Sequence, residues 1–180
     1  MILCSYYKVW FSTACKWLLI TAVCVHAVHI LVFLCRNVFK GVNLDNFVPS
    51  WFVTFNGIMV SLVAGPDMLP PAMAKAVLYW GLFIYTVTIP FMVWRLAARE
   101  VKPGMLHTQA IVLAPCSLCL VSYLNIVKEP VHAVVMIFYA CVILSLLFIL
   151  VKLPVFFSVP FAPGFAGLTF PMSIGVVAST

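Results

Sequence analysis

Six long apolar runs, with the charged residues confined between them or at their ends, constrain the fold of this chain more than any other feature. A helix needs about 20 apolar residues to cross the hydrocarbon core of a bilayer. Roughly a quarter of the residues in a soluble domain are charged, whereas 8% of the residues in this chain are charged. We therefore predict an all-α, multi-pass membrane protein with a single transmembrane domain over residues 1–180, containing about six helices in three helical hairpins. The predicted helices are residues 17–35, 48–64, 76–96, 108–124, 131–151 and 163–180.

Short connections with turn-forming residues join several of these runs, at residues 65–71, 100–104 and 128–130. Short loops make neighbouring helices antiparallel, so successive loops lie on opposite sides of the membrane. The positive-inside rule assigns the side with more Lys and Arg to the cytoplasm. We expect the cytoplasmic side to carry Arg36, Lys40, Arg95, Arg99, Lys102 and Lys152, and the other side to carry Lys8, Lys16, Lys75 and Lys128.

The runs alternate in character along the chain. Gly, Pro, Ser, Thr, Asn and Gln occupy 6 of 61 positions in the first, third and fifth runs, but 20 of 52 positions in the other three. Purely apolar helices suit a lipid-facing position, whereas small and polar residues belong at helix contacts or along a hydrated path. Each hairpin is therefore expected to pair an outer helix with an inner one. Close helix packing alone would also account for the small residues.

Helix-breaking residues lie at membrane depth in the three polar runs, at Asn56-Gly57, Pro115 and Pro171. A proline inside a helix removes one backbone hydrogen bond, and backbone groups freed in a bilayer must face protein or water. Their coincidence predicts a common, partly hydrated path. No carboxylate lies inside any run, which disfavours proton coupling and a cation pathway and favours passive flow of an anion. The pore-lining candidates are Thr54, Asn56, Gly57, Pro115, Ser117, Thr169, Pro171 and Ser173.

Two histidines of the first run could bind a haem or a metal ion. His26 and His29 are three residues apart and share a helix face. Such a site would need matching histidines on a facing helix, but His107 and His132 lie at the ends of runs. We therefore expect no metal and no cofactor, and we expect the pair to bond hydroxyl or backbone groups at a helix contact.

A C-x-x-C motif at Cys116 and Cys119 makes a membrane thiol oxidoreductase the alternative hypothesis. The motif lies in the middle of a run, where apolar surroundings oppose thiolate formation, so we expect no enzymatic activity. The basic residues are scattered singly along the chain, which excludes a nucleic-acid-binding surface. Membrane lipid and a small anionic solute are the expected partners.

Three stretches resemble the tellurite-resistance/dicarboxylate transporter (TDT) family, which includes the slow anion channels of plants. They are FVPSWFVTFNGIMVSLVAGP at 47–66, HTQAIVLAPCSLCLVSYLNI at 107–126 and LPVFFSVPFAPGFAGLTFPMSIGVVAST at 153–180. The resemblance implies five helical hairpins whose inner helices surround an anion pore, with the runs here matching the fourth to the ninth helices. It also implies that Phe170, in the Thr169-Phe170-Pro171 motif, is the pore gate.

The chain departs from the family pattern in two ways. Asn56 and Cys116 stand where small apolar residues are commoner. The first three helices and the last have no counterpart, so the resemblance implies a truncated member or a pore completed by two or more copies. The expected function is passive transport of a C4-dicarboxylate such as malate, tellurite, sulfite, chloride or nitrate across the plasma (inner) membrane, with a homo-oligomer as one possibility. A non-transporting fragment is the third hypothesis.

Overall fold

The computed structural model describes residues 1–158 and 167–179, and the described residues form helices joined by short connections. Helices satisfy their own backbone hydrogen bonds, which a bilayer requires of any spanning segment. Four segments are long and apolar enough to cross a membrane: α2 (Ser12–Asn37), α5 (Pro71–Ala98), Gly104–Ile126 and α7 (His132–Phe157). The third of these joins most of the 3₁₀ helix η3 (Pro103–Val112) to α6 (Leu113–Ile126).

The number of full-length spans is therefore four in the described residues, fewer than the six expected. The expected helix at 48–64 is divided into α3 (Trp51–Asn56), the 3₁₀ turn η1 (Gly57–Met59) and α4 (Val60–Ala64). The expected helix at 163–180 contributes α8 (Thr169–Ser179), while residues 163–166 and 180 lie outside the described part of the chain. Both segments are apolar but shorter than a spanning helix.

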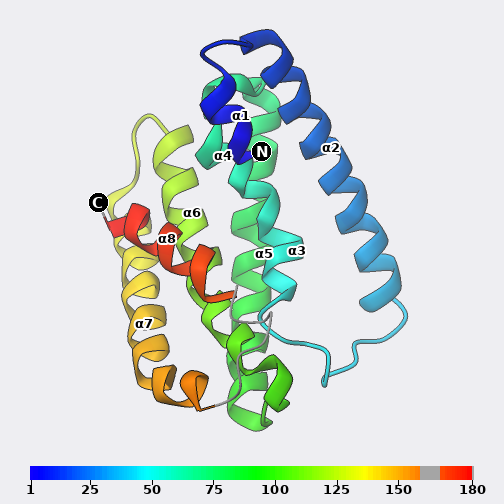
Figure 1. The fold of residues 1–180 in the computed structure, drawn as a ribbon, viewed down its shortest axis with the longest axis vertical. Helices are drawn as coiled ribbons and strands as arrows, with labels where there is room; N and C mark the ends of the chain where they lie inside the picture. The colour runs from blue at the N-terminus through cyan, green and yellow to red at the C-terminus, as the bar shows by residue number, and fades with distance from the viewer. Residues whose placement is uncertain (159–166, 180) are drawn as a thin grey trace.

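Figure 1 shows α5 and α6 in the middle of the molecule, with α2 along one edge and α7 along the other. α8 lies across α6 and α7 rather than alongside them (Figure 1). The C-terminal ends of α2, α5 and α7 all point toward the lower side of this view. The six basic residues assigned to the cytoplasm are on or just after these ends, so the fold gathers them at one end of the bundle.

Burial separates the long spans into the two classes that the sequence indicated. In an 18-residue stretch of each span, 83% of the residues are buried in Gly104–Ile126, against 17% in α2, 33% in α5 and 22% in α7. The polar run is thus the inner helix, and the three apolar runs are outer helices, as expected. α8 departs from this pattern, because Pro171, Ile174 and Gly175 are its only buried residues.

Two further elements were not expected from the sequence. α1 (Ile2–Tyr7) precedes α2 and packs against α2 and α4. The short 3₁₀ helix η2 (Pro66–Met68) lies between α4 and α5 and carries Asp67, whose carboxylate lies 3.1 Å from Lys8 Nζ. This exposed ion pair joins the N-terminal segment to the α4–α5 connection, where it contributes at most about 1 kcal/mol.

Candidate functional site

The break between α3 and α4 lies against an imidazole of α2. The α-helix ends at Asn56 and continues as one 3₁₀ turn from Gly57. His26 Nε2 lies 2.9 Å from the backbone oxygen of Thr54, and because a carbonyl oxygen only accepts, Nε2 donates this hydrogen bond. A Cβ atom on Gly57 would lie 3.1 Å from His26 Cε1. The glycine therefore gives the imidazole room to reach the interrupted turn.

The two prolines expected to break inner helices lie instead in the first turn of an α-helix. Pro115 is the third residue of α6, and Pro171 is the third residue of α8. Proline is tolerated at the start of α8 because the first N–H groups of a helix have no intrahelical partner. Upstream of Pro115 the chain is a ten-residue 3₁₀ helix, and 3₁₀ runs longer than three or four residues are uncommon. Pro115 therefore marks a change of helix type rather than a kink within one α-helix.

The segments that carry Gly57, Pro115 and Pro171 border one cavity of about 590 Å³. It also receives residues from the N-terminal segment, from α2 and from η3. His26 is the one lining residue with a titratable side chain among the described residues, and no carboxylate lines the cavity there. The lining residues are Met1, Ile2, Leu3, His26, Phe52, Val53, Gly57, Val60, Ile111, Ala114, Pro115, Leu118, Gly167, Phe170 and Pro171.

Four of the predicted gate and pore-lining residues meet at this cavity, namely Gly57, Pro115, Phe170 and Pro171. They come from η1, α6 and α8, so three segments that are distant in the sequence share one lining. The Phe170 side chain is partly exposed, at 38%, and it lies beside Pro171 in the first turn of α8.

The other predicted lining residues lie elsewhere. Asn56 is buried against α5, where its Nδ2 donates to the Gly81 oxygen at 3.0 Å. Ser117 is buried within α6 and donates to the Leu113 oxygen at 2.8 Å. Thr54, Thr169 and Ser173 do not line the cavity.

Sequence reasoning missed most of the apolar lining. Phe52, Val53, Ile111 and Leu118 border the cavity, but apolar residues of a membrane helix carry no pattern that separates a lumen from a helix contact. His26 gave a usable signal, because a histidine within an apolar run requires a hydrogen-bonding partner.

The two cysteines of the C-x-x-C motif are fully buried in α6. The Cys116 thiol donates to the Leu113 oxygen at 3.1 Å, and Cys119 Sγ lies 3.9 Å from the Gly81 oxygen. Both cysteines are free thiols and neither lines the cavity. This geometry gives a dissolved substrate no route to the thiols.

The family model described as SLAC1, voltage-dependent anion channel, matches residues 1–180. Neither a curated protein nor a solved structure matches the chain.

Proposed function

Because the chain belongs to the SLAC1 family of voltage-dependent anion channels, which confirms the resemblance drawn from its motifs, we propose that it carries small anions passively along a path that includes the 590 Å³ cavity. At the level of the family it is a multi-pass membrane protein for anion transport and not an enzyme. The observation that supports this path is the meeting of Gly57, Pro115, Phe170 and Pro171 at one cavity without a carboxylate among its described lining residues.

The electrostatic character of the cavity suits an anion better than a cation. Acidic rings are the usual means of attracting cations into a pore, and the described lining has none. The first turn of α8 borders the space, and the N-terminal end of a helix carries a partial positive charge. His26 adds a polar side chain to the lining. A monovalent inorganic anion is the simplest solute, with C4-dicarboxylates, sulfite and tellurite as the other proposed solutes.

Phe170 is the proposed gate. Its ring borders the cavity from the first turn of α8, and Pro171 restricts the backbone beside it. An apolar ring can close a narrow path by excluding both water and ions. A homo-oligomer and a plasma-membrane location are further proposals for the same protein.

Phe170→Ala is expected to raise anion flux, because it removes the ring from the lining. The increase should be roughly tenfold, the factor that corresponds to lowering a barrier by about 1.4 kcal/mol. The measurement is chloride, nitrate, sulfite, tellurite and malate flux from liposomes that contain equal amounts of inserted wild-type or variant protein.

Phe83→Ala is the matched control for this experiment. Phe83 is an exposed phenylalanine of the outer helix α5 and does not line the cavity. Its replacement should leave flux unchanged. An equal flux in wild type and Phe170→Ala, with both folded, would remove Phe170 as the gate. A complete absence of flux in every variant would contradict the proposed transport function.

The double variant Cys116→Ala/Cys119→Ala is expected to retain anion flux within roughly twofold of the wild type, since buried cysteine acts mainly as a small hydrophobe. In the folded wild type, a membrane-permeable maleimide should label Cys35, which is exposed near the C-terminal end of α2, but not the two α6 thiols. A quinone- or thiol-dependent activity that the double variant loses would instead support thiol chemistry.

A further inference from the structure

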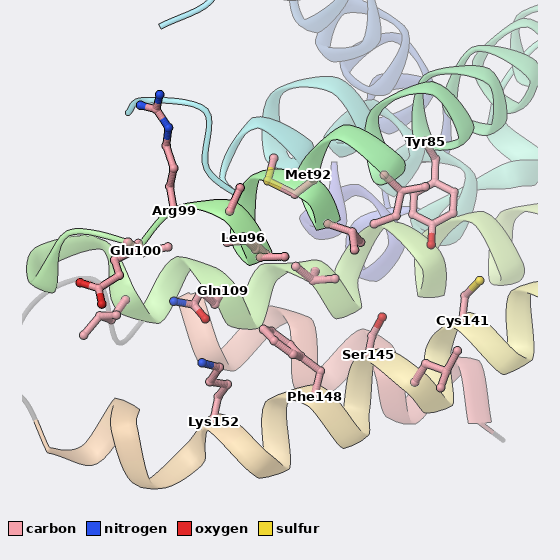
Figure 2. Close-up of a pocket in the computed structure, with 18 residues that line it drawn as sticks. Tyr85, Met92, Leu96, Arg99, Glu100, Gln109, Cys141, Ser145, Phe148 and Lys152 are labelled. Carbon is pink, nitrogen blue, oxygen red and sulfur yellow. The ribbon is translucent and has the colours of Figure 1, made fainter. Parts of the chain in front are cut away.

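A second, larger cavity of about 890 Å³ lies between α5, η3 and α7. Figure 2 shows the side chains that line it, with α7 on one side and α5 on the other. Its walls are mostly apolar, with Met92 and Leu96 from α5 facing Leu144 and Phe148 from α7. α5 and α7 are outer helices of the bundle, so the groove lies where acyl chains of the bilayer have access.

The groove has the length of one membrane leaflet. Cys141 and Lys152, both on α7, mark its two ends. Eleven residues of α-helix separate them, which corresponds to about 16 Å at a rise of about 1.5 Å per residue. The hydrocarbon core of a bilayer is about 30 Å thick, so the groove extends from one membrane surface to roughly the midplane.

Polar groups lie at the outer end of the groove. The Gln109 residue is 7% exposed and lines the cavity, and its amide makes no hydrogen bond to the described residues. Figure 2 shows the ends of the Gln109 and Lys152 side chains facing each other across the mouth. Lys152 has no ion pair among residues 1–158 and 167–179. The Gln109 amide is therefore available to bond a group that enters the mouth.

The charges around this mouth are mixed, and basic residues outnumber acidic ones at this end of the bundle. Arg99 and Lys152 line it, together with Glu100. Figure 2 shows Arg99 pointing away from the groove, and its guanidinium lies 3.6 Å from Asp45, which also lies 3.9 Å from Lys102. Lys152 is therefore the basic group available inside the mouth, which the Glu100 carboxylate also borders.

We propose that this groove binds one anionic phospholipid, with an acyl chain along the apolar walls and the phosphate at Lys152 and Gln109. The mouth lies at the end of the bundle where the six basic residues gather, which the positive-inside rule assigns to the cytoplasm. Basic pockets between helices on that side are suited to anionic headgroups. A charged headgroup on a long acyl chain matches one cation and one amide donor at the top of an apolar channel. A second copy of the chain would fit this arrangement less well.

The test is native mass spectrometry of the whole chain after exposure to an equimolar mixture of phosphatidylglycerol and phosphatidylcholine. The wild type is expected to retain one phosphatidylglycerol in preference to phosphatidylcholine. Lys152→Gln should lower that preference roughly fivefold, the contribution of one basic residue near a membrane surface. Lys128→Gln, an exposed lysine at the opposite end of the bundle, should leave it unchanged.

A steric pair tests the groove itself without changing charge. Leu144→Trp adds bulk to a residue that lines the groove, and Leu147→Trp adds the same bulk to an exposed α7 residue outside it. Only the first should reduce retention of lipid. Equal retention of both lipids by the wild type, equal effects of the two lysine variants, or a change of oligomeric state with Leu144→Trp at constant lipid content would each overturn the proposal.

Discussion

Gly81→Ala is expected to lower the free energy of unfolding by about 1–3 kcal/mol, the usual range for overpacking a filled interior. The same change in an unconstrained helix would stabilise it by up to about 1 kcal/mol, because alanine favours helix more than glycine does. At Gly81 the new Cβ would overlap the side chain of Met59, with its Cγ at 2.6 Å. The expected sign is therefore opposite to that of helix propensity.

Met59 has little space to move away from such a Cβ. It is completely buried between α5 and α6, and its Sδ lies 4.0 Å from Cys119 Sγ. The Asn56 amide also donates to the Gly81 oxygen at 3.0 Å, which holds the two helices at this separation. A glycine that allows close approach of backbones is a common device of membrane helix packing.

Thermal or denaturant unfolding of the purified chain in detergent provides the measurement. Gly104→Ala is the matched control, because a Cβ on Gly104 would meet no atom within 4 Å. In a Met59→Ala background, Gly81→Ala should cost little, since the smaller side chain leaves room for the Cβ. Additive losses in the double variant would show that Met59 is not the group that excludes a side chain at this position.

The sequence supports prediction of the long helices because the bilayer sets their length. α2, α5 and α7 follow from uninterrupted apolar runs, and the scarcity of small and polar residues in those runs also identifies them as outer helices. Pro90 within α5 did not end that helix, because lipid offers the backbone no alternative to helical hydrogen bonding. Local helix breakers therefore have different effects that depend on their surroundings.

The shorter elements depend on such surroundings and could not be predicted in detail. Asn56-Gly57 divides its helix where His26 meets the backbone, a contact between segments far apart in the sequence. Pro115 correctly indicated where the helix is irregular, but it did not predict the change from 3₁₀ to α-helix. The orientation of α8 across α6 depends on contacts such as that of Gly175 with Leu113, which hydropathy does not reveal.

The candidate site also contains residues that could be predicted from the sequence and residues that could not. Gly57, Pro115 and Pro171 were identifiable because residues that disturb a helix are conspicuous within an apolar run, and Phe170 followed from the family motif beside Pro171. Asn56 was assigned to the same lining from its polarity, yet its amide bonds an α5 carbonyl. Polarity indicates that a side chain needs a partner, but the partner can equally be a neighbouring helix or a water-filled path.

Arg95→Leu is expected to lower the free energy of unfolding by about 3 kcal/mol, more than any exposed charge in the chain, since hydrogen bonds from charged groups each contribute roughly 1.5–3 kcal/mol. Arg95 is 2% exposed although it is ionic. Its Nε donates to the Leu44 oxygen at 3.1 Å, and its Nη1 donates to the oxygens of Arg99 and Glu100 at 2.9 and 3.4 Å. The guanidinium thus joins the α2–α3 connection to the end of α5.

Arg99→Leu is the control, because it removes the same charge from the same helix end at an exposed position. Arg99 and Asp45 are 53% and 54% exposed in their side chains, and such surface pairs contribute about 0–1 kcal/mol. Arg95→Lys should recover only part of the loss, because a single ammonium group cannot reproduce the diverging donors of a guanidinium. Unfolding in detergent and chymotrypsin cleavage within residues 38–50 give the two readouts. If Arg95→Leu and Arg99→Leu lose equal stability with the connection equally protected, then Arg95 does not anchor the α2–α3 connection, and packing of Phe47 and Trp51 must hold it instead.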